Sequence, residues 1–467
     1  MGEKIPKFVD LSEARNIISL LGKEFAIVQN PSYLFPRFEI YPLAPKISTP
    51  RKKLVAVVKD MDGTTTTTEQ LCLHSQEYMI GQITGKWGDP TWKGLDKVND
   101  YPHIIGNSTT RHVEYLINKY GKFIKMENFR KSYLTAILWT LSQGKDEGRK
   151  REVRSNMVAL GWGDMLTDNE FLTLITRQNF EEKRYQKEIN HLLQKYGKFF
   201  HPKDFTDKVR AAIDIYYYRY HQILSLIDKG EGERLSKELL HEEGRRLIEP
   251  MPGVEIFLSL IKGWLGEDLV LFYEELAEHL LTSPYVSYTQ NELDKFRKRL
   301  APLGRYFSIH PIKVGIVTSS IAYEANVVLK EVFRVAYERI SHWKIPSEKK
   351  EKILENFSDY KKLYDSIITA NDSSEIRLKP HHDLYSMALH EMGVSKDEFP
   401  FVIGFEDSES GTIALRAAGI GLCIALPFTD TSGHDFTAAT RVIWGGLPEV
   451  ILVNNLFLSP SVLKNFE

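Results

Sequence analysis

Six apolar runs of strand length constrain the fold of this chain more than any other feature. They cover Leu54–Val58, Lys313–Val317, Ser366–Thr369, Pro400–Ile403, Gly421–Leu426 and Glu449–Val453. Helical patterns, in which apolar residues return every three or four positions, lie between them at Ala322–Phe333, Leu384–Met392 and Gly411–Ala418. Strands of this kind that alternate with helices form parallel sheets covered on both faces. The sequence therefore predicts an α/β fold with a doubly wound, Rossmann-like parallel sheet.

Residues 69–249 have a different composition from this core. They are rich in Tyr, Phe, Lys and Glu at helical spacing and contain few β-branched runs, which predicts an inserted, mostly α-helical domain. We expect residues 51–68 and 250–467 to form the α/β core, with helical insertions at about 263–310 and 334–363, and residues 1–50 to be an N-terminal extension. The block KYGKF occurs twice in the helical domain, at Lys119–Phe123 and Lys195–Phe199. It indicates either a pseudo-repeat or a chance similarity of two helix ends.

Charge and cysteine content narrow the classes of function. The 467 residues contain 61 Lys and Arg against 62 Asp and Glu, a net charge of −1, which disfavours a nucleic-acid or anionic-membrane partner. The two cysteines, Cys72 and Cys423, are too few for a disulfide framework and have no Cys or His at metal-ligand spacing. No apolar leader and no uncharged run of membrane-spanning length is present. We expect a soluble cytoplasmic protein.

Two aspartates, Asp60 and Asp62, follow the first apolar run. Side chains two residues apart on a strand point to the same side, so both carboxylates can reach one site. One could then attack an electrophile while the other transfers a proton, and Gly63 permits a tight turn away from the sheet. The same residues also fit an Asp-Gly turn with a helix cap among the threonines that follow.

Thr318 and Ser319 also come directly after an apolar run. Hydroxyls and free backbone N–H groups at a helix start form an anion site, although a simple helix N-cap explains them as well. Lys379, in the stretch Arg377-Leu378-Lys379-Pro380, lies along the chain between two such strand ends. A lone lysine is usually a solvated surface charge, and its position here favours a functional role.

Glu406 and Asp407 follow the fourth apolar run. Adjacent acids after a strand suit a cation that prefers oxygen ligands, such as Mg²⁺. A helix capped by Ser408 or Ser410 is the alternative. Because ligands bind at the carboxyl ends of the strands in open α/β sheets, we expect all four stretches to converge on one site.

Taken in order, the motifs DMDGT, VTSS, LKP and GFEDSESG resemble the four motifs of the haloacid dehalogenase (HAD) superfamily of phosphohydrolases. The stretches KPHHDLYSMALHEMGV, GFEDSESGTIALRAAGIG and PMPGVEIFLSLIK are most similar to its β-phosphoglucomutase-like branch. The resemblance covers residues 51–63, 250–262, 312–333 and 366–453. It implies a HAD core, with residues 69–249 as an enlarged cap domain.

The resemblance also implies roles for the residues of the four motifs. Asp60 would be the nucleophile that forms an aspartyl-phosphate, and Asp62 the acid and base. Thr318, with Ser319 beside it, would bind the phosphoryl group, and Lys379 would neutralise charge in the transition state.

A Mg²⁺ ion is the cofactor that the resemblance implies. Asp407, with Glu406 assisting, would bind it together with the Asp60 carboxylate and the backbone carbonyl of Asp62. The cation offsets the repulsion between the carboxylate nucleophile and the phosphate.

The resemblance thus implies a Mg²⁺-dependent phosphatase, a phosphoric monoester hydrolase, acting on a small phosphorylated metabolite. Sugar phosphomutases of the branch have a cap histidine where this chain has Cys72, with His74 two residues further on, so we favour hydrolysis over isomerisation. A sugar phosphomutase and a non-catalytic HAD-fold binding module are the alternative hypotheses.

Two stretches of the predicted cap bear on the substrate. Ile104–His112 is similar to the specificity loop of the branch, but Thr109 stands where sugar-phosphate-binding relatives have arginine, and Arg111 lies two residues later. We predict that Arg111 contacts the substrate. Gly85–Trp92 predicts a surface turn with buried tryptophans, or else a wall of the substrate pocket.

Overall fold

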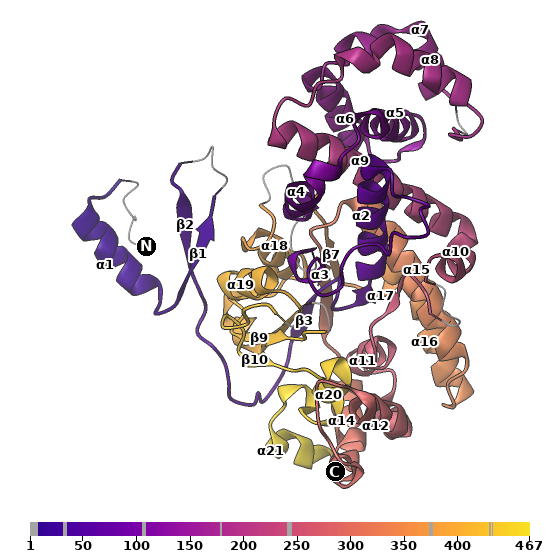
Figure 1. Cartoon of the computed structure of the whole chain (residues 1–467). Coiled ribbons are helices and arrows are strands. Elements are labelled where there is room, and N and C mark those ends of the chain that lie inside the picture. The colour runs from indigo at the N-terminus through magenta and orange to yellow at the C-terminus, as the bar shows by residue number, and fades with distance from the viewer. Residues whose placement is uncertain are drawn as a thin grey trace. The chain divides into compact units, whose positions relative to one another are not determined.

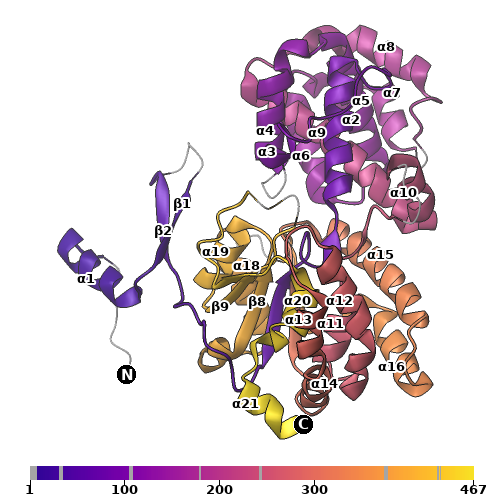
Figure 2. The same cartoon turned by 60° about the horizontal axis from the view of Figure 1, so that its bottom comes forward.

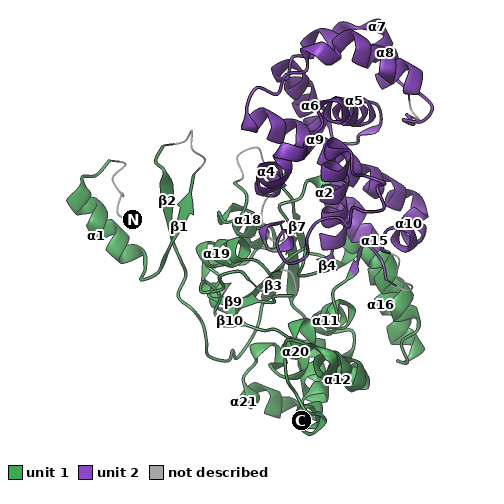
Figure 3. Cartoon of the chain, viewed as in Figure 1, with its two compact units in different colours: residues 1–66, 250–322, 332–467 green, residues 67–249, 323–331 purple. Residues whose placement is uncertain are grey.

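The computed structural model describes residues 8–30, 35–104, 109–177, 180–240, 245–372, 377–428, 431 and 433–467 (Figure 1). The chain forms two compact units (Figure 3). Unit 1 comprises Met1–Thr66, Pro250–Ala322 and Val332–Glu467, and unit 2 comprises Thr67–Glu249 and Tyr323–Glu331. The chain leaves unit 1 along strand β4, Thr66–Thr67, and returns along β5, Glu249–Pro250, and these two strands pair.

The core of unit 1 is a six-stranded parallel sheet. Its order is β10-β9-β8-β3-β6-β7, and the strands span Ala56–Asp60 (β3), Lys313–Val317 (β6), Ser366–Ile368 (β7), Val402–Glu406 (β8), Leu422–Ala425 (β9) and Arg441–Val442 (β10). The chain winds from β3 through β6 to β7, then crosses to the other side of β3 for the remaining strands. The switch point lies between β3 and β8, where ligands bind in sheets of this type. The predicted doubly wound α/β fold is confirmed.

One predicted strand is wrong. The apolar run Glu449–Val453 belongs mostly to helix α20, Gly446–Leu452, and the sixth strand is β10 instead. Short apolar runs do not distinguish a buried strand from a buried helix. Pro448 lies in the first turn of α20, where its missing N–H costs no hydrogen bond, and Glu449 accepts a bond from the backbone N–H of Gly445.

Helices cover both faces of the sheet (Figure 2). On one face Ala56, Val58 and Val317 pack in one apolar cluster with helices α18, Asp383–Glu391, and α19, Glu409–Ala417. On the other face the Phe257 ring of α11, Val254–Ile261, lies 5.6 Å from the Phe405 ring of β8. The helices predicted at residues 384–392 and 411–418 are therefore confirmed.

Further helices are attached to this core where the sequence predicted helical insertions. The first insertion contains α12, Tyr273–Thr282, α13, Gln290–Arg297, and α14, Leu300–Ile309. The second contains the end of α15, Ala322–Ser341, then α16, Ser347–Phe357, and α17, Tyr360–Leu363. Near the C-terminus lies α21, Pro460–Leu463. The N-terminal extension forms helix α1, Leu11–Leu21, and a hairpin of β1, Phe25–Gln29, and β2, Phe38–Pro42.

The regular secondary structure in the described residues of unit 2 is helical, apart from its ends in β4 and β5. Its helices are α2 (Glu69–Thr84), α3 (Tyr101–Ile104), α4 (Thr109–Tyr120), α5 (Met126–Gln143), α6 (Glu147–Ala159), α7 (Asn169–Ile175), α8 (Gln186–Tyr196), α9 (Phe205–Leu226) and α10 (Gly232–Leu240). Helix α9 packs against α2, α4 and α5. The Gly85–Trp92 stretch forms a turn after α2, with Trp87 and Trp92 packed over Gly81; Trp87 is 39% exposed. None of the helices in the described residues has an apolar stretch long enough to cross a membrane.

The two KYGKF blocks have the same local structure. Each ends a helix and continues as a short 3₁₀ turn, Gly121–Phe123 and Gly197–Phe199. In each block the Lys ammonium and the Tyr hydroxyl bond to one aspartate: Lys119 and Tyr120 at 2.6 and 2.7 Å from Asp100, and Lys195 and Tyr196 at 2.5 and 2.9 Å from Asp168. The shared anchoring favours a pseudo-repeat over chance similarity.

Candidate active site

Asp60 is the last residue of β3 and is buried at the switch point of the sheet. The hydroxyl of Thr65 donates to its backbone carbonyl at 2.6 Å. Gly63, three residues after the end of the strand, has a φ of +75°, a conformation that favours glycine. Its N–H bonds to the carbonyl of Thr66 at 2.9 Å. This tight turn holds the end of the strand and keeps Asp62 close to Asp60.

Lys379 reaches the same point from the loop before α18. Its ammonium ion-pairs with Asp60 Oδ1 and lies 2.7 Å from Glu406 Oε1. It also lies 5.2 Å from the centre of the Tyr385 ring. Burial opposes the charge on this lysine, but Asp60 and Glu406 outweigh burial and raise the pKa of Lys379. The lysine is therefore a fixed, protonated cation rather than the solvated surface charge that a lone lysine usually is.

The hydroxyls that follow β6 contact Asp62. Thr318 Oγ1 donates to Asp62 Oδ2 at 3.1 Å, and Ser320 Oγ donates to the same oxygen at 3.3 Å. The Thr318 hydroxyl also caps the N–H of Ser320 at 2.9 Å. Ser319 is exposed beside them. The structure thus brings Thr318 to the two aspartates, and it leaves the Ser319 hydroxyl open to solvent.

Three acids, Asp60, Glu406 and Asp407, form a buried cluster whose carboxylate oxygens lie within 4.8 Å of one another. Both oxygens of Glu406 have partners besides this cluster. Oε1 accepts from the Tyr385 hydroxyl at 2.5 Å, and Oε2 accepts from Ser408 Oγ at 3.1 Å. Glu406 therefore also holds Lys379, and it remains with Asp60 and Asp407 in the group of acids that could hold a cation.

Asp407 is fitted closely against the turn after β3. A Cβ built on Gly63 would lie 2.7 Å from Asp407 Cγ, so only glycine allows this approach. Thr64 Oγ1 donates to Asp407 Oδ1 at 3.5 Å. Two of the predicted motifs thus meet in direct side-chain contact.

The charge of the site is unbalanced. Asp60, Asp62, Glu406 and Asp407 contribute four carboxylates, and among the described residues Lys379 ion-pairs with two of them, Asp60 and Glu406. Burial, together with Glu406 and Asp62, raises the pKa of Asp60, while Lys379 opposes the rise. A divalent cation would offset the excess negative charge, and carboxylate oxygens are the ligands that Mg²⁺ prefers. The donor set therefore fits the predicted Mg²⁺.

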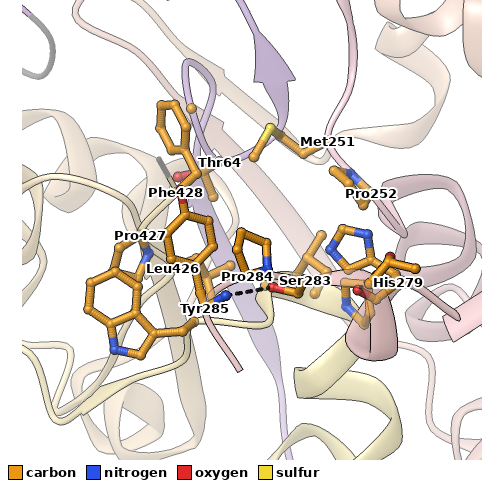
Figure 4. Close-up of a pocket in the computed structure, with 16 residues that line it drawn as sticks. Thr64, Met251, Pro252, His279, Ser283, Pro284, Tyr285, Leu426, Pro427 and Phe428 are labelled. Atoms are coloured by element: carbon orange, nitrogen blue, oxygen red, sulfur yellow. Dashed lines mark hydrogen bonds between the residues drawn. The ribbon is translucent and has the colours of Figure 1, made fainter. Parts of the chain in front are cut away.

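A cavity of about 290 Å³ is lined in part by Gly63 and Thr64, which also contact Asp407 of the acid cluster (Figure 4). The first helical insertion contributes His279 and Tyr285 to its wall, and Phe428 comes from the chain after β9. No Lys, Arg, Asp or Glu is among the residues that line it, and burial lowers the pKa of His279. Residues in contact with the acid cluster thus line an uncharged cavity, and the first helical insertion forms part of the wall of this cavity.

The predicted cap residues lie in unit 2. Arg111 is exposed on α4, and the adjoining residues 105–108 lie outside the described part of the chain. Cys72 accepts a bond from the Tyr216 hydroxyl at 3.4 Å. His74 Nε2 lies 3.0 Å from Arg219 Nη2, and burial together with Arg219 lowers the pKa of His74 to about 3. His74 is therefore neutral and accepts a bond from the guanidinium, so it is poorly suited to donate a proton.

Sequence reasoning missed two residues of the site. Tyr385 holds Glu406 and lies against Lys379, and Ser320 bonds to Asp62. Ser320 follows the predicted hydroxyls directly and could have been included with them. Tyr385 gave no signal, because a tyrosine in an amphipathic helix reads as a core residue.

No protein-family model and no curated protein matches the chain. Among solved structures, CbbY from Rhodobacter sphaeroides in complex with phosphate is similar, at 15% identity and a TM-score of 0.36 over 87% of this chain and 100% of that chain. CbbY in complex with xylulose-(1,5)-bisphosphate gives 15% identity and 0.36 over 86% and 99%. A HAD-superfamily hydrolase of subfamily IA, variant 1, from Geobacter sulfurreducens PCA gives 12% and 0.29 over 87% and 98%.

Proposed function

We propose that this chain is a HAD-superfamily, Mg²⁺-dependent phosphohydrolase that cleaves a small phosphate ester through an aspartyl-phosphate on Asp60. The observation that carries the proposal is the convergence of the four motifs, three at strand ends and one in the loop before α18, on one point. There the Lys379 ammonium pairs with Asp60, and Thr318 bonds to Asp62. Asp407 lies in the same acid cluster as Asp60.

Asp60 and Asp62 divide the chemistry in this proposal. A carboxylate oxygen of Asp60 attacks phosphorus, the bond from phosphorus to the ester oxygen breaks, and Asp62 gives a proton to the leaving oxygen. Asp62 then takes a proton from water, whose oxygen attacks phosphorus and releases Asp60. Hydrogen bonds from Thr318 and Ser320 hold Asp62 in place for both proton transfers.

Lys379 and the hydroxyls after β6 stabilise the negative charge of the phosphoryl group in this proposal. The Lys379 ammonium is already at Asp60 Oδ1, so it can stabilise charge that develops on the transferring group without reorganising. Ser319 is open to donate to a phosphoryl oxygen, and Arg111 of unit 2 is a candidate contact to the substrate. Asp60 and Asp407, with the backbone carbonyl of Asp62 and with Glu406 nearby, would hold Mg²⁺. The ion would reduce the repulsion between the two anions.

The test is hydrolysis of p-nitrophenyl phosphate, with and without Mg²⁺, by the parent and by Asp60→Asn. We expect Mg²⁺-dependent turnover by the parent and a loss on the order of 10⁴-fold or more in the variant, as for removal of other catalytic nucleophiles. Asp294→Asn is the control, because this carboxylate accepts its bonds from Tyr273 and Gln290, in the first insertion, and not at the site. Turnover that survives Asp60→Asn would rule out the assigned nucleophile.

A panel of phosphate esters separates the alternative functions. Isomerisation of a hexose phosphate that a bisphosphate stimulates would identify a phosphomutase instead. Mg²⁺ binding without turnover of any ester on the panel would identify a binding module.

A further inference from the structure

The N-terminal extension contacts the loop that carries Lys379. Its hairpin is tied to the core by Arg416, a fully buried side chain that ion-pairs with Glu24 and donates to the carbonyl of Ala44 at 2.6 Å. Tyr41, in strand β2 of the hairpin, is 9% exposed. Its neighbours belong to the loop Arg377–His382, which leads into α18. The resemblance to known phosphohydrolases does not cover the N-terminal extension. This extension nevertheless contacts the loop that carries Lys379, the predicted catalytic lysine.

The Tyr41 hydroxyl uses its full hydrogen-bonding capacity at this contact. It donates to Glu39 and lies 2.7 Å from Arg377 Nη1 and 2.8 Å from His381 Nδ1. Since a phenol has one donor and two acceptor positions, both loop residues donate to it. The His381 ring also packs edge-on against the Tyr41 ring, with centres 5.2 Å apart.

The two loop residues that Tyr41 holds lie on either side of Lys379 in the sequence. Arg377 precedes the lysine by two residues and His381 follows it by two. The Lys379 side chain reaches in the other direction, to Asp60 and Glu406. The backbone N–H of Arg377 also donates to Asp383, the first residue of α18. The Tyr41 hydroxyl thus contacts both arms of the loop whose middle residue carries the ammonium, and Glu39 of the same strand adds an ion pair to Arg377 at 3.1 Å.

We propose that Tyr41 is a positioning residue for Lys379, and that the N-terminal hairpin serves to brace the lysine loop. The catalytic consequence rests on the proposed phosphohydrolase function. Lysine has a long, flexible stem, so its ammonium stays on Asp60 only if the backbone that carries it stays in place. Displacements of about 1 Å at a catalytic group can cost on the order of 10²-fold in rate.

The first experiment is a double-mutant cycle of Tyr41→Phe and Lys379→Ala. Tyr41→Phe removes the shared acceptor and leaves Arg377 and His381 each short of a bond, while Arg377 keeps its ion pairs with Glu39 and Asp383. We expect it to lower kcat/KM for p-nitrophenyl phosphate by about 10-fold or more in the parent, and by less than about 2-fold in the Lys379→Ala background. Equal losses in both backgrounds would show that Tyr41 does not act through Lys379. The same cycle on binding of inorganic phosphate, measured by calorimetry, needs no turnover.

The second experiment is hydrogen exchange, which does not depend on the proposed function. Tyr41→Phe should raise exchange in a peptide covering residues 377–382 and leave the interior of α18 unchanged. Tyr273→Phe is the matched control. It is also a buried tyrosine, 1% exposed, whose hydroxyl donates to a carboxylate, Asp294, and accepts from an amide, Gln290, at 3.1 Å. This variant should leave both exchange at 377–382 and kcat/KM unchanged.

The outcomes distinguish the two proposals. Suppose that the parent neither hydrolyses an ester nor binds phosphate, while Tyr41→Phe raises hydrogen exchange at residues 377–382. This result would support the proposed role of Tyr41 in holding the loop and would contradict the phosphohydrolase proposal. If the parent is active and Tyr41→Phe changes neither exchange nor kcat/KM, the positioning role of Tyr41 is refuted. Loss of activity without a change in exchange at residues 377–382 would also refute it.

Discussion

Adding one methyl group at Gly63 should raise the Mg²⁺ concentration that the chain needs for hydrolysis. Two costs arise in Gly63→Ala. The φ of +75° places an L-residue in the left-handed region, at a cost of about 1–2 kcal/mol. The new Cβ would also lie 2.7 Å from Asp407 Cγ and 2.8 Å from Phe428 Cε1, well inside contact distance, so the carboxylate must move.

The second cost, the displacement of the Asp407 carboxylate, should appear as a change in the Mg²⁺ dependence of hydrolysis. Perturbing groups that merely orient metal ligands typically costs 10- to 100-fold in metal affinity or activity. We therefore expect the Mg²⁺ concentration for half-maximal hydrolysis to rise by at least about 10-fold in Gly63→Ala. Initial rates of p-nitrophenyl phosphate hydrolysis over a Mg²⁺ titration measure this shift, and urea unfolding measures the change in stability.

Gly393→Ala separates strain from displacement of the carboxylate. Gly393 also belongs to unit 1 and has a φ of +62°, but the nearest atom to its added Cβ is Lys313 Nζ at an ordinary 3.8 Å. It should lose about 1–2 kcal/mol of stability and keep the parental Mg²⁺ dependence. If Gly63→Ala and Gly393→Ala behave alike in the Mg²⁺ titration, Asp407 is not the metal-binding carboxylate.

Three further predictions concern buried charges. Arg149→Met should cost unit 2 about 3–5 kcal/mol in urea unfolding, because Asp214, 1% exposed, loses its ion pair; adding Asp214→Asn should recover part of the loss, and strict additivity would contradict the pairing. The pKa of His74 is lowered to about 3 from 6.5, first by burial and then by Arg219, so protons bind preferentially to the unfolded state between these pH values and stability falls as pH falls through them. Parent stability should therefore drop by about 1 kcal/mol more than that of His74→Gln between pH 7 and pH 5.5, and parallel pH profiles would refute this. Lys59 is fully buried and its Nζ has no hydrogen-bond partner among the described residues, so Lys59→Met should stabilise unit 1 by about 1–3 kcal/mol in urea unfolding, whereas a loss would indicate a role for the amine.

Much of the core could be predicted because its signals are local. The run at Lys313–Val317 predicted strand β6 with the same bounds, since an apolar, β-branched run bounded by turn residues is a sufficient description of a buried strand. The same reasoning wrongly predicted a strand at Glu449–Val453. Helix α20 is buried on all sides, so its apolar residues show no helical periodicity in the sequence. Length and composition could not separate the two cases.

The candidate site was predictable for a related reason. Asp60, Thr318 and Asp407 each stand at or just after a strand end, so a parallel sheet brings them to one edge whatever the rest of the chain does. The division of labour within the site was not predictable. The sequence predicted that Glu406 assists the metal, and Glu406 does lie in the acid cluster with Asp60 and Asp407, but its bonds to Lys379, Tyr385 and Ser408 had no signal in the sequence.

The sequence by itself determined the parallel sheet, the helical character of residues 69–249 and the strand ends that carry Asp60, Thr318 and Asp407, since these follow from periodicity and chain order. Only the tertiary structure decided which side chains became partners. Tyr41 and Arg377 are 336 residues apart, and Gly63 and Asp407 have no local relation, yet each pair is in contact. Such contacts depend on how whole elements pack, because a hydrogen bond or a van der Waals fit responds to displacements of less than 1 Å or so, far finer than any residue pattern encodes.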